Sequence, residues 1–114
     1  MKPAATLKKN YEFRRLYQKG VSAVGRCMVI YCRKNRLGRN RVGITVSVKL
    51  GNAVTRNRAR RRLREVCRLN GDKLSKGWDL VVVARGRTLS GSWKELNETF
   101  LHLCGKLKLL EEKG

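Results

Sequence analysis

The sequence predicts a single α+β domain, a two-layer sandwich in which helices cover one face of a four-stranded sheet. The chain has 114 residues, enough for one hydrophobic core, and 41% of them are hydrophobic, so a packed core is expected rather than disorder. No repeat, low-complexity tract or linker divides the chain, and residues 1–114 are therefore treated as one domain. Helix and strand patterns follow one another in the order α-β-β-β-α-β-α.

The first half of the chain contains one predicted helix and three predicted strands. Residues 10–20 have the apolar spacing of a short helix, and Asn10 is expected to cap it. A short strand is expected over residues 21–24, and a second over 27–33, which is rich in residues that favour strands. Residues 41–48 alternate between β-branched and small or polar side chains. One face of this third strand is therefore expected to pack in the core, and the other to be open to a ligand.

The second half contains two predicted helices and the fourth strand. Asn52 opens a helix that is expected to run to about Leu69. The strand over residues 78–85 is continuously apolar, which predicts a central position, buried on both faces. Ser92 and Glu95 fit a capping box at the start of the last helix. An apolar stripe on that helix is expected to pack in the core: Trp93, Leu96, Phe100, Leu103, Cys104 and Leu107.

The charge balance indicates a polyanionic partner. Lysine and arginine number 28 against 8 aspartate and glutamate, which gives a formal net charge of +20. Self-repulsion of this size opposes a compact state unless a polyanion neutralises it. Nucleic acid is favoured over an anionic membrane, because no apolar run reaches the length of a bilayer-spanning helix.

The location of the protein is expected to be the cytoplasm. Residues 1–9 lack the apolar core of a secretory signal. The four cysteines are spaced too irregularly for a zinc ribbon or a disulfide framework, and each falls in an apolar pattern. They are therefore expected to be buried free thiols, as in a reducing compartment: Cys27, Cys32, Cys67 and Cys104.

The segment from Arg56 to Arg68 is the most informative part of the sequence. It carries seven arginines and one acid, Glu65. On a helical wheel a narrow apolar seam lies on one side, and a broad guanidinium face lies opposite. The guanidinium fork donates paired hydrogen bonds to phosphate and stacks on bases, whereas a merely solvated face usually mixes lysine with glutamate. This pattern favours nucleic-acid binding.

The same segment resembles a known family. Residues 49–65 are similar to the signature RNR segment of the bacterial ribonuclease P protein subunit. Phe13 and Tyr17 are similar to the family's paired aromatics. The predicted strands over 28–31, 41–47 and 78–85 also follow its pattern, so the likeness covers nearly the whole chain in collinear order. Three positions depart from the family: Ala59 replaces a larger aliphatic residue, Arg62 an apolar one, and Val48 a basic one.

The resemblance implies a fold like that of ribosomal protein S5 domain 2 and a partnership with a large catalytic RNA, which cuts the 5′ leader from precursor tRNA. Magnesium ions would be held mainly by that RNA, and no catalytic residue, metal ligand or DNA partner is expected of the protein. It implies that the arginine helix binds the catalytic RNA through Arg56, Asn57, Arg58, Arg60, Arg61, Arg64 and Arg68. It also implies that the leader lies in a cleft between the first helix and the sheet, with Phe13, Tyr17, Tyr31 and Lys49 as candidate contacts.

The residues by themselves are consistent with this cleft. Phe13 and Tyr17 are one helical turn apart, and Tyr31 has the strand parity to face them. Aromatic side chains above a basic groove form a stacking platform for single-stranded RNA. The alternative is that Phe13 and Tyr17 are simply core residues.

The residues also bear on three alternative functions. A stand-alone protein nuclease would need a positioned acid–base pair or metal cluster, but the acids are scattered and the only histidine, His102, is expected to be exposed. A DNA-binding helix would be expected to pair base-reading Asn or Gln with a dimer element, and no heptad or dimer seam is evident. A structural ribosomal protein stays open on composition alone.

Overall fold

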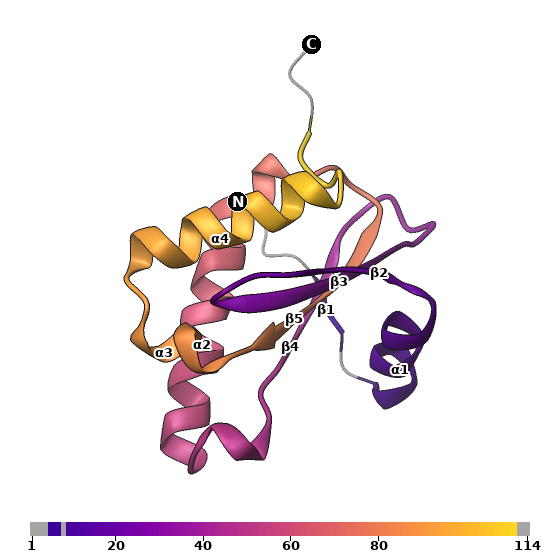
Figure 1. The fold of residues 1–114 in the computed structure, drawn as a ribbon. Helices are drawn as coiled ribbons and strands as arrows, with labels where there is room; N and C mark the ends of the chain where they lie inside the picture. Colours follow the sequence, from indigo (N-terminus) through magenta and orange to yellow (C-terminus); the bar gives the residue numbers. More distant parts are fainter. Residues whose placement is uncertain (1–4, 8, 112–114) are drawn as a thin grey trace.

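The computed structural model describes residues 5–7 and 9–111. Five strands form one mixed sheet in the spatial order β1-β4-β5-β3-β2 (Figure 1). In chain order the elements are β1 (Ala5–Thr6), α1 (Asn10–Lys19), β2 (Val21–Val24), β3 (Met28–Lys34), β4 (Arg41–Thr45), a 3-10 turn (Val48–Leu50), α2 (Ala53–Asn70), a second 3-10 turn (Gly71–Lys73), β5 (Trp78–Ala84), α3 (Gly86–Ser90) and α4 (Trp93–Lys106). The predicted fold class is confirmed, with the two-residue β1 and the short α3 as additions.

The continuously apolar strand lies at the centre of the sheet, as predicted. β5 pairs antiparallel with β3 and parallel with β4. Its residues Leu80, Val81 and Val82 are all buried, because helices cover the sheet on both sides of them. The continuous apolar run, without polar residues in alternation, therefore identified the strand that is covered on both faces.

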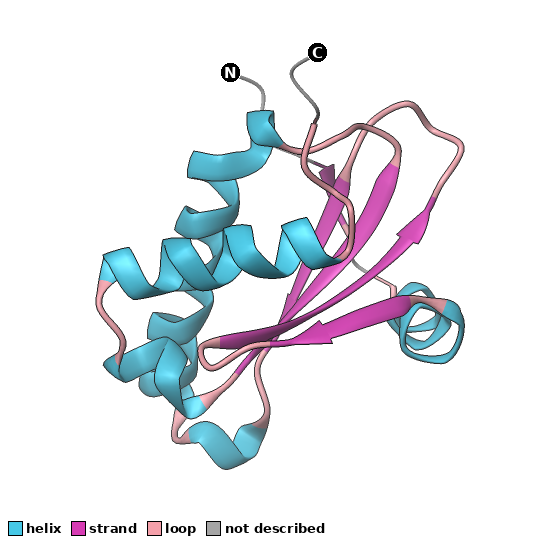
Figure 2. Cartoon of the chain, turned by 45° about the horizontal axis from the view of Figure 1, so that its top comes forward, coloured by secondary structure: helices cyan, strands magenta, loops and turns pink. Residues whose placement is uncertain are grey.

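The helices do not all cover one face. The main core lies between the sheet and the helices α2 and α4, with Leu63 and Phe100 among its buried residues. α1 instead packs on the opposite face, where Leu16 contacts Val81 in a second, smaller cluster (Figure 2). Because β5 is apolar on both sides, its second face also needs an apolar cover, and α1 supplies it. The expectation of a single covered face was wrong for this helix.

The helix starts are set by local hydrogen bonds. Asn52 caps α2, where its Oδ1 accepts from the Thr55 backbone N–H at 3.0 Å. Ser92 caps α4 as predicted, with its Oγ accepting from the Glu95 N–H at 3.1 Å. Asn10, predicted to cap α1, is instead its first residue. Lys9 holds the capping position, and its backbone N–H donates to Glu12 at 3.3 Å.

β4 is shorter than predicted. It ends at Thr45, and the chain then turns through a 3-10 segment. Ser47 starts this turn, because its side chain accepts a hydrogen bond from the Lys49 backbone N–H. Val48, expected to face the core, is 72% exposed as a result.

The four cysteines are free, and three of them are buried as expected. Cys27, Cys32 and Cys104 are buried, and Cys67 is partly buried. Burial raises the pKa of the Cys32 thiol to about 11 and those of Cys67 and Cys104 to about 12. These thiols therefore carry no charge at neutral pH and behave as small hydrophobic side chains. Within the described part of the chain, no helix is long and apolar enough to span a bilayer.

Candidate nucleic-acid interface

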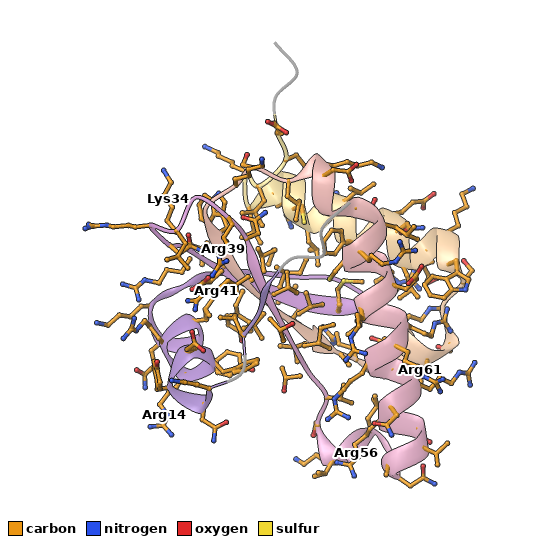
Figure 3. The ribbon with its side chains drawn as sticks, turned by 180° about the vertical axis from the view of Figure 1, so that it is seen from behind. Arg14, Lys34, Arg39, Arg41, Arg56 and Arg61 are labelled. Atoms are coloured by element: carbon orange, nitrogen blue, oxygen red, sulfur yellow. The ribbon has the colours of Figure 1, made fainter. Side chains whose placement is uncertain are left out.

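The helix α2 presents the arginine face that its sequence predicts. Ala59, Leu63 and Val66 form the buried seam, with no solvent exposure. The residues Asn57, Arg58, Arg61, Arg64 and Arg68 are exposed. In Figure 3, Arg56 and Arg61 lie on this helix, toward the right of the view, and α1 lies at the left.

The exposed arginines differ in whether they have a hydrogen-bond or ion-pair partner within the protein. Among the described residues, Arg58, Arg61 and Arg64 have no hydrogen-bond or ion-pair partner. Arg68 instead forms a two-point ion pair with Glu65, at 3.1 and 2.5 Å, which lowers the pKa of Glu65. The first three guanidinium groups therefore supply most of the uncompensated charge on this face.

Arg62 faces the protein rather than the solvent. Its Nη1 and Nη2 donate to the carbonyls of Leu89 and Gly91, at 2.7 and 2.5 Å. Its guanidinium lies 5.0 Å from the ring centroid of Trp93. Arg62 thus joins α2 to α3 and to the start of α4.

The contact with Arg62 also explains an error in the predicted core. Trp93 was expected in the apolar stripe of α4, but it is 46% exposed and covers the guanidinium. The buried members of that stripe are Leu96, Phe100, Leu103 and Cys104, and Leu107 is partly buried.

A cleft of about 420 Å³ opens between α1, β4 and α2. Its lining residues are Asn10, Phe13, Arg14, Tyr17, Ile44, Thr45, Val46 and Arg60. The cleft therefore combines two aromatic rings with two guanidinium groups. Arg60, which the resemblance assigns to the catalytic RNA, reaches the cleft from α2.

The aromatic residues of the cleft are held in place by their neighbours. Tyr17 is 42% exposed and packs edge-on against Tyr31, with ring centroids 4.9 Å apart. Burial raises the pKa of Tyr17, although a hydrogen bond with Thr45 works in the other direction, so its hydroxyl stays protonated at neutral pH. The exposed part of its ring is available for stacking.

Phe13 belongs both to the cleft and to the core. It is half-buried and packs against the cluster of Leu16 and Val81. A Cβ at Gly43 would lie 2.6 Å from its ring, so only glycine lets β4 approach Phe13 so closely. Phe13 thus lines the cleft and also packs in the core, a position that is compatible with both interpretations left open by the sequence.

An ion-pair network fixes α1 to the sheet. Arg41 on β4 donates two hydrogen bonds to Asp79 on β5, at 2.9 and 2.8 Å, and a third to Glu12 on α1 at 2.7 Å. Burial acts to raise the pKa of Asp79, but hydrogen bonds from Arg41 and Asn35 outweigh it and leave that pKa below its ordinary value. Asp79 therefore stays ionised and anchors Arg41, which in turn fixes the position of α1.

Two polar residues of the cleft, Asn10 and Arg14, were missed by sequence reasoning, and two predicted residues do not line it. These two are Lys49 and Tyr31, and Tyr31 packs against Tyr17. Arg14 precedes Tyr17 by three residues on α1, and this spacing could have identified it as a neighbour. The sequence pattern indicates Asn10 only as a helix cap. Lys49 is exposed on the turn between β4 and α2 and is not among the lining residues.

Among the described residues, groups suited to acid–base chemistry are gathered neither on the arginine face of α2 nor in the cleft beside α1. His102 is exposed on α4, as predicted. Among residues 5–7 and 9–111, no three His, Cys, Asp or Glu side chains are grouped so that they could hold a metal ion. The arrangement is suited to binding phosphate and bases.

Comparison with known proteins gives one consistent family. A family model described as Ribonuclease P matches residues 1–108. The ribonuclease P protein component of Natranaerobius thermophilus is 43% identical over 98% of this chain and 97% of its own length. That of Alkaliphilus metalliredigens is 43% identical over 91% and 94%.

Solved structures agree. The RNase P protein of Staphylococcus aureus has a TM-score of 0.82 at 33% identity, covering 95% of this chain and 99% of its own. The RNase P protein from Thermotoga maritima has a TM-score of 0.77 at 30% identity, covering 85% and 92%.

Proposed function

Because the chain belongs to the family of ribonuclease P protein components, we propose that its two basic surfaces bind two different RNAs. As the protein subunit of this endoribonuclease, it serves in the maturation of tRNA 5′ ends together with an RNA subunit. In this proposal the arginine face of α2 binds the catalytic RNA, and the cleft beside α1 binds the leader of precursor tRNA. The relatives do not favour a structural ribosomal protein.

The assignment of α2 rests on its uncompensated charge. Arg58, Arg61 and Arg64 are exposed, and in the described structure no acid neutralises them. Repulsion between neighbouring guanidinium groups destabilises a bare helix, and RNA phosphates remove that repulsion. A folded RNA that stays bound would thus stabilise the helix that binds it.

The single observation that supports the leader assignment is the exposed ring of Tyr17 inside a cleft with two arginines. Tyr17 can stack on a base, while Arg14 and Arg60 can contact the flanking phosphates. Base stacking is tolerant of sequence, because every base has an aromatic face. A leader site needs this tolerance, since leaders differ from one transcript to another.

The donor groups of the cleft do not fit a magnesium ion. Mg²⁺ prefers carboxylate, phosphate and water oxygens. The cleft offers guanidinium groups, an amide and two hydroxyls, and no carboxylate lines it. The carboxylates of Glu12 and Asp79, outside the cleft, are bound by Arg41. We therefore assign the magnesium ions mainly to RNA phosphates, with the protein reducing repulsion between the RNA strands. The buried free thiols are consistent with a cytoplasmic location.

The leader site can be tested with two tyrosines of the same helix. Tyr17→Ala removes the ring in the cleft, whereas Tyr11→Ala removes an exposed ring outside it. Loss of one stacked base costs about 1–3 kcal/mol, so Tyr17→Ala should weaken binding of precursor tRNA by the holoenzyme roughly five- to 150-fold.

Binding of mature tRNA, which has no leader, should not change, and assembly with the catalytic RNA should survive. Tyr11→Ala should behave like the unaltered protein in both assays. Equal weakening toward precursor and mature tRNA, or an equal effect of the two substitutions, would remove the leader from the cleft.

A further inference from the structure

A half-exposed tryptophan lies beside the arginine face of α2. Trp93, the first residue of α4, is 46% exposed, and the guanidinium of Arg62 lies over its ring, 5.0 Å from the ring centroid. A single apolar side chain at a protein surface is by itself ordinary. The surroundings of the ring therefore decide what it can bind.

The surroundings of Trp93 continue the arginine face. Arg58 precedes Arg62 by four residues, so their side chains are neighbours on the surface of α2. Arg58 is exposed and, in the described part of the chain, has no hydrogen-bond or ion-pair partner. α3, which leads into α4, lies beside α2 (Figure 1). The ring of Trp93 therefore borders the uncompensated charge of α2.

Arg62 holds the ring in place from one side. Its Nη1 and Nη2 donate to the carbonyls of Leu89 and Gly91, at 2.7 and 2.5 Å, which fixes the guanidinium against the indole. The exposed part of the ring is available to a second planar group. A side chain that is already held in one position loses little conformational entropy when it binds a partner.

Two acids in these segments are already paired within the protein. Glu95, in the first turn of α4, accepts hydrogen bonds from Arg87 at 2.6 and 3.0 Å. Glu65, the one acid of the arginine segment, accepts from Arg68 at 3.1 Å. Each carboxylate is thus compensated by a guanidinium, which reduces its repulsion of RNA phosphates.

We propose that Trp93 stacks on an unpaired base of the catalytic RNA, next to the phosphates that the arginine face binds. The inference rests on the proposed function, in which that face meets the catalytic RNA. The exposed arginines contact the RNA backbone, whereas the indole contacts a base that is splayed out of a loop or bulge. Arg62 supports the ring from the protein side and does not itself touch the RNA.

The first test separates stacking from charge. Trp93→Leu removes the aromatic ring, and Trp93→Tyr keeps one. The control is Tyr11→Leu, which removes an exposed ring on α1 that does not line the cleft. Affinity for the catalytic RNA is measured over a salt series, and thermal melting confirms that each variant is folded.

The affinity of Trp93→Leu should fall roughly five- to 150-fold through the loss of one stacked base. Its slope of log affinity against log salt should equal that of the unaltered protein, because stacking releases no counterions. Trp93→Tyr should recover most of the affinity, and Tyr11→Leu should bind like the unaltered protein. Normal affinity of folded Trp93→Leu, a reduced salt slope, or no recovery in Trp93→Tyr would overturn the proposal.

The second test reports on the ring directly, which a purely structural role of Trp93 would not affect. The chain has two tryptophans, so Trp78→Phe leaves Trp93 as the only one. Acrylamide, a collisional quencher of indole fluorescence, should reach the half-exposed ring in the free protein. It should be excluded from the ring in the complex with the catalytic RNA. Equal quenching in the free protein and in the complex would mean that no base covers Trp93.

The proposed function is judged separately, by the salt slope of Arg61→Ala. A lowered slope in that variant, together with normal binding by Trp93→Leu, would leave the arginine face as the RNA site and remove only the aromatic contact. An unchanged slope in Arg61→Ala would instead count against the proposed function itself.

Discussion

Arg62 lies within the arginine tract but is expected to stabilise the protein rather than bind RNA. Arg62→Ala would leave the carbonyls of Leu89 and Gly91 without their donors and remove the guanidinium from Trp93. Gly91 is buried, so its unsatisfied carbonyl costs about 1–3 kcal/mol. Leu89 is half-buried and can recruit water, and a cation–π contact on a half-exposed ring contributes about 0.5–1 kcal/mol.

One effect works against this loss. The Nε of Arg62 is buried without a partner, and its removal relieves part of the cost. The free energy of unfolding is therefore expected to fall by about 1–3 kcal/mol, which lowers Tm by roughly 5–15 °C in a domain of this size. Arg62→Lys keeps the charge but not the two-armed geometry, so most of the loss should persist.

The assay pairs thermal melting with the salt dependence of binding to the catalytic RNA. Arg62→Ala should lower Tm and leave the salt slope of the folded protein unchanged. Arg61→Ala, one residue away and exposed, should lower the slope by about 0.7–0.9 and leave Tm nearly unchanged. A variant at Arg62 that melts normally but loses a unit of salt slope would show that this arginine contacts RNA and that the reasoning is wrong.

Three further predictions concern the arginine face and the ion-pair network that fixes α1. Arg61→Ala with Arg64→Ala should weaken binding of the catalytic RNA without altering the melting transition. If six to ten phosphates are contacted, the affinity of the unaltered protein for the catalytic RNA should fall roughly 10³- to 10⁵-fold between about 50 and 200 mM salt. A flat salt profile would contradict the phosphate-dominated mode. Because the pKa of Asp79 is lowered, its contribution to stability is present above the ordinary value of 3.8 and is lost as pH falls further. Asp79→Asn should therefore have a lower urea midpoint than the unaltered protein at pH 7, and the difference should shrink below about pH 4; an equal difference at both pH values would mean that the charge of Asp79 is not what matters.

Much of the architecture follows from patterns that are local in the chain. The uninterrupted apolar run of β5 identified the central strand, and Asn52 and Ser92 marked the starts of α2 and α4. The arginine face and its apolar seam followed from helical periodicity alone. These features could be predicted because they depend on the backbone period and on hydrogen bonds between residues a few positions apart.

The tertiary structure alone decided how distant segments meet. Placement of α1 on the second face of the sheet depends on Val81 and on the network of Arg41, which joins three elements. Arg60 from α2 completes the lining of the cleft. Arg62 points into the protein because it donates to the carbonyls of Leu89 and Gly91 and packs on Trp93. Helical periodicity assigns a side chain to a face but does not say what that face meets. The direction in which an arginine acts, toward RNA or toward its own protein, is set by neighbours that lie far away in the sequence.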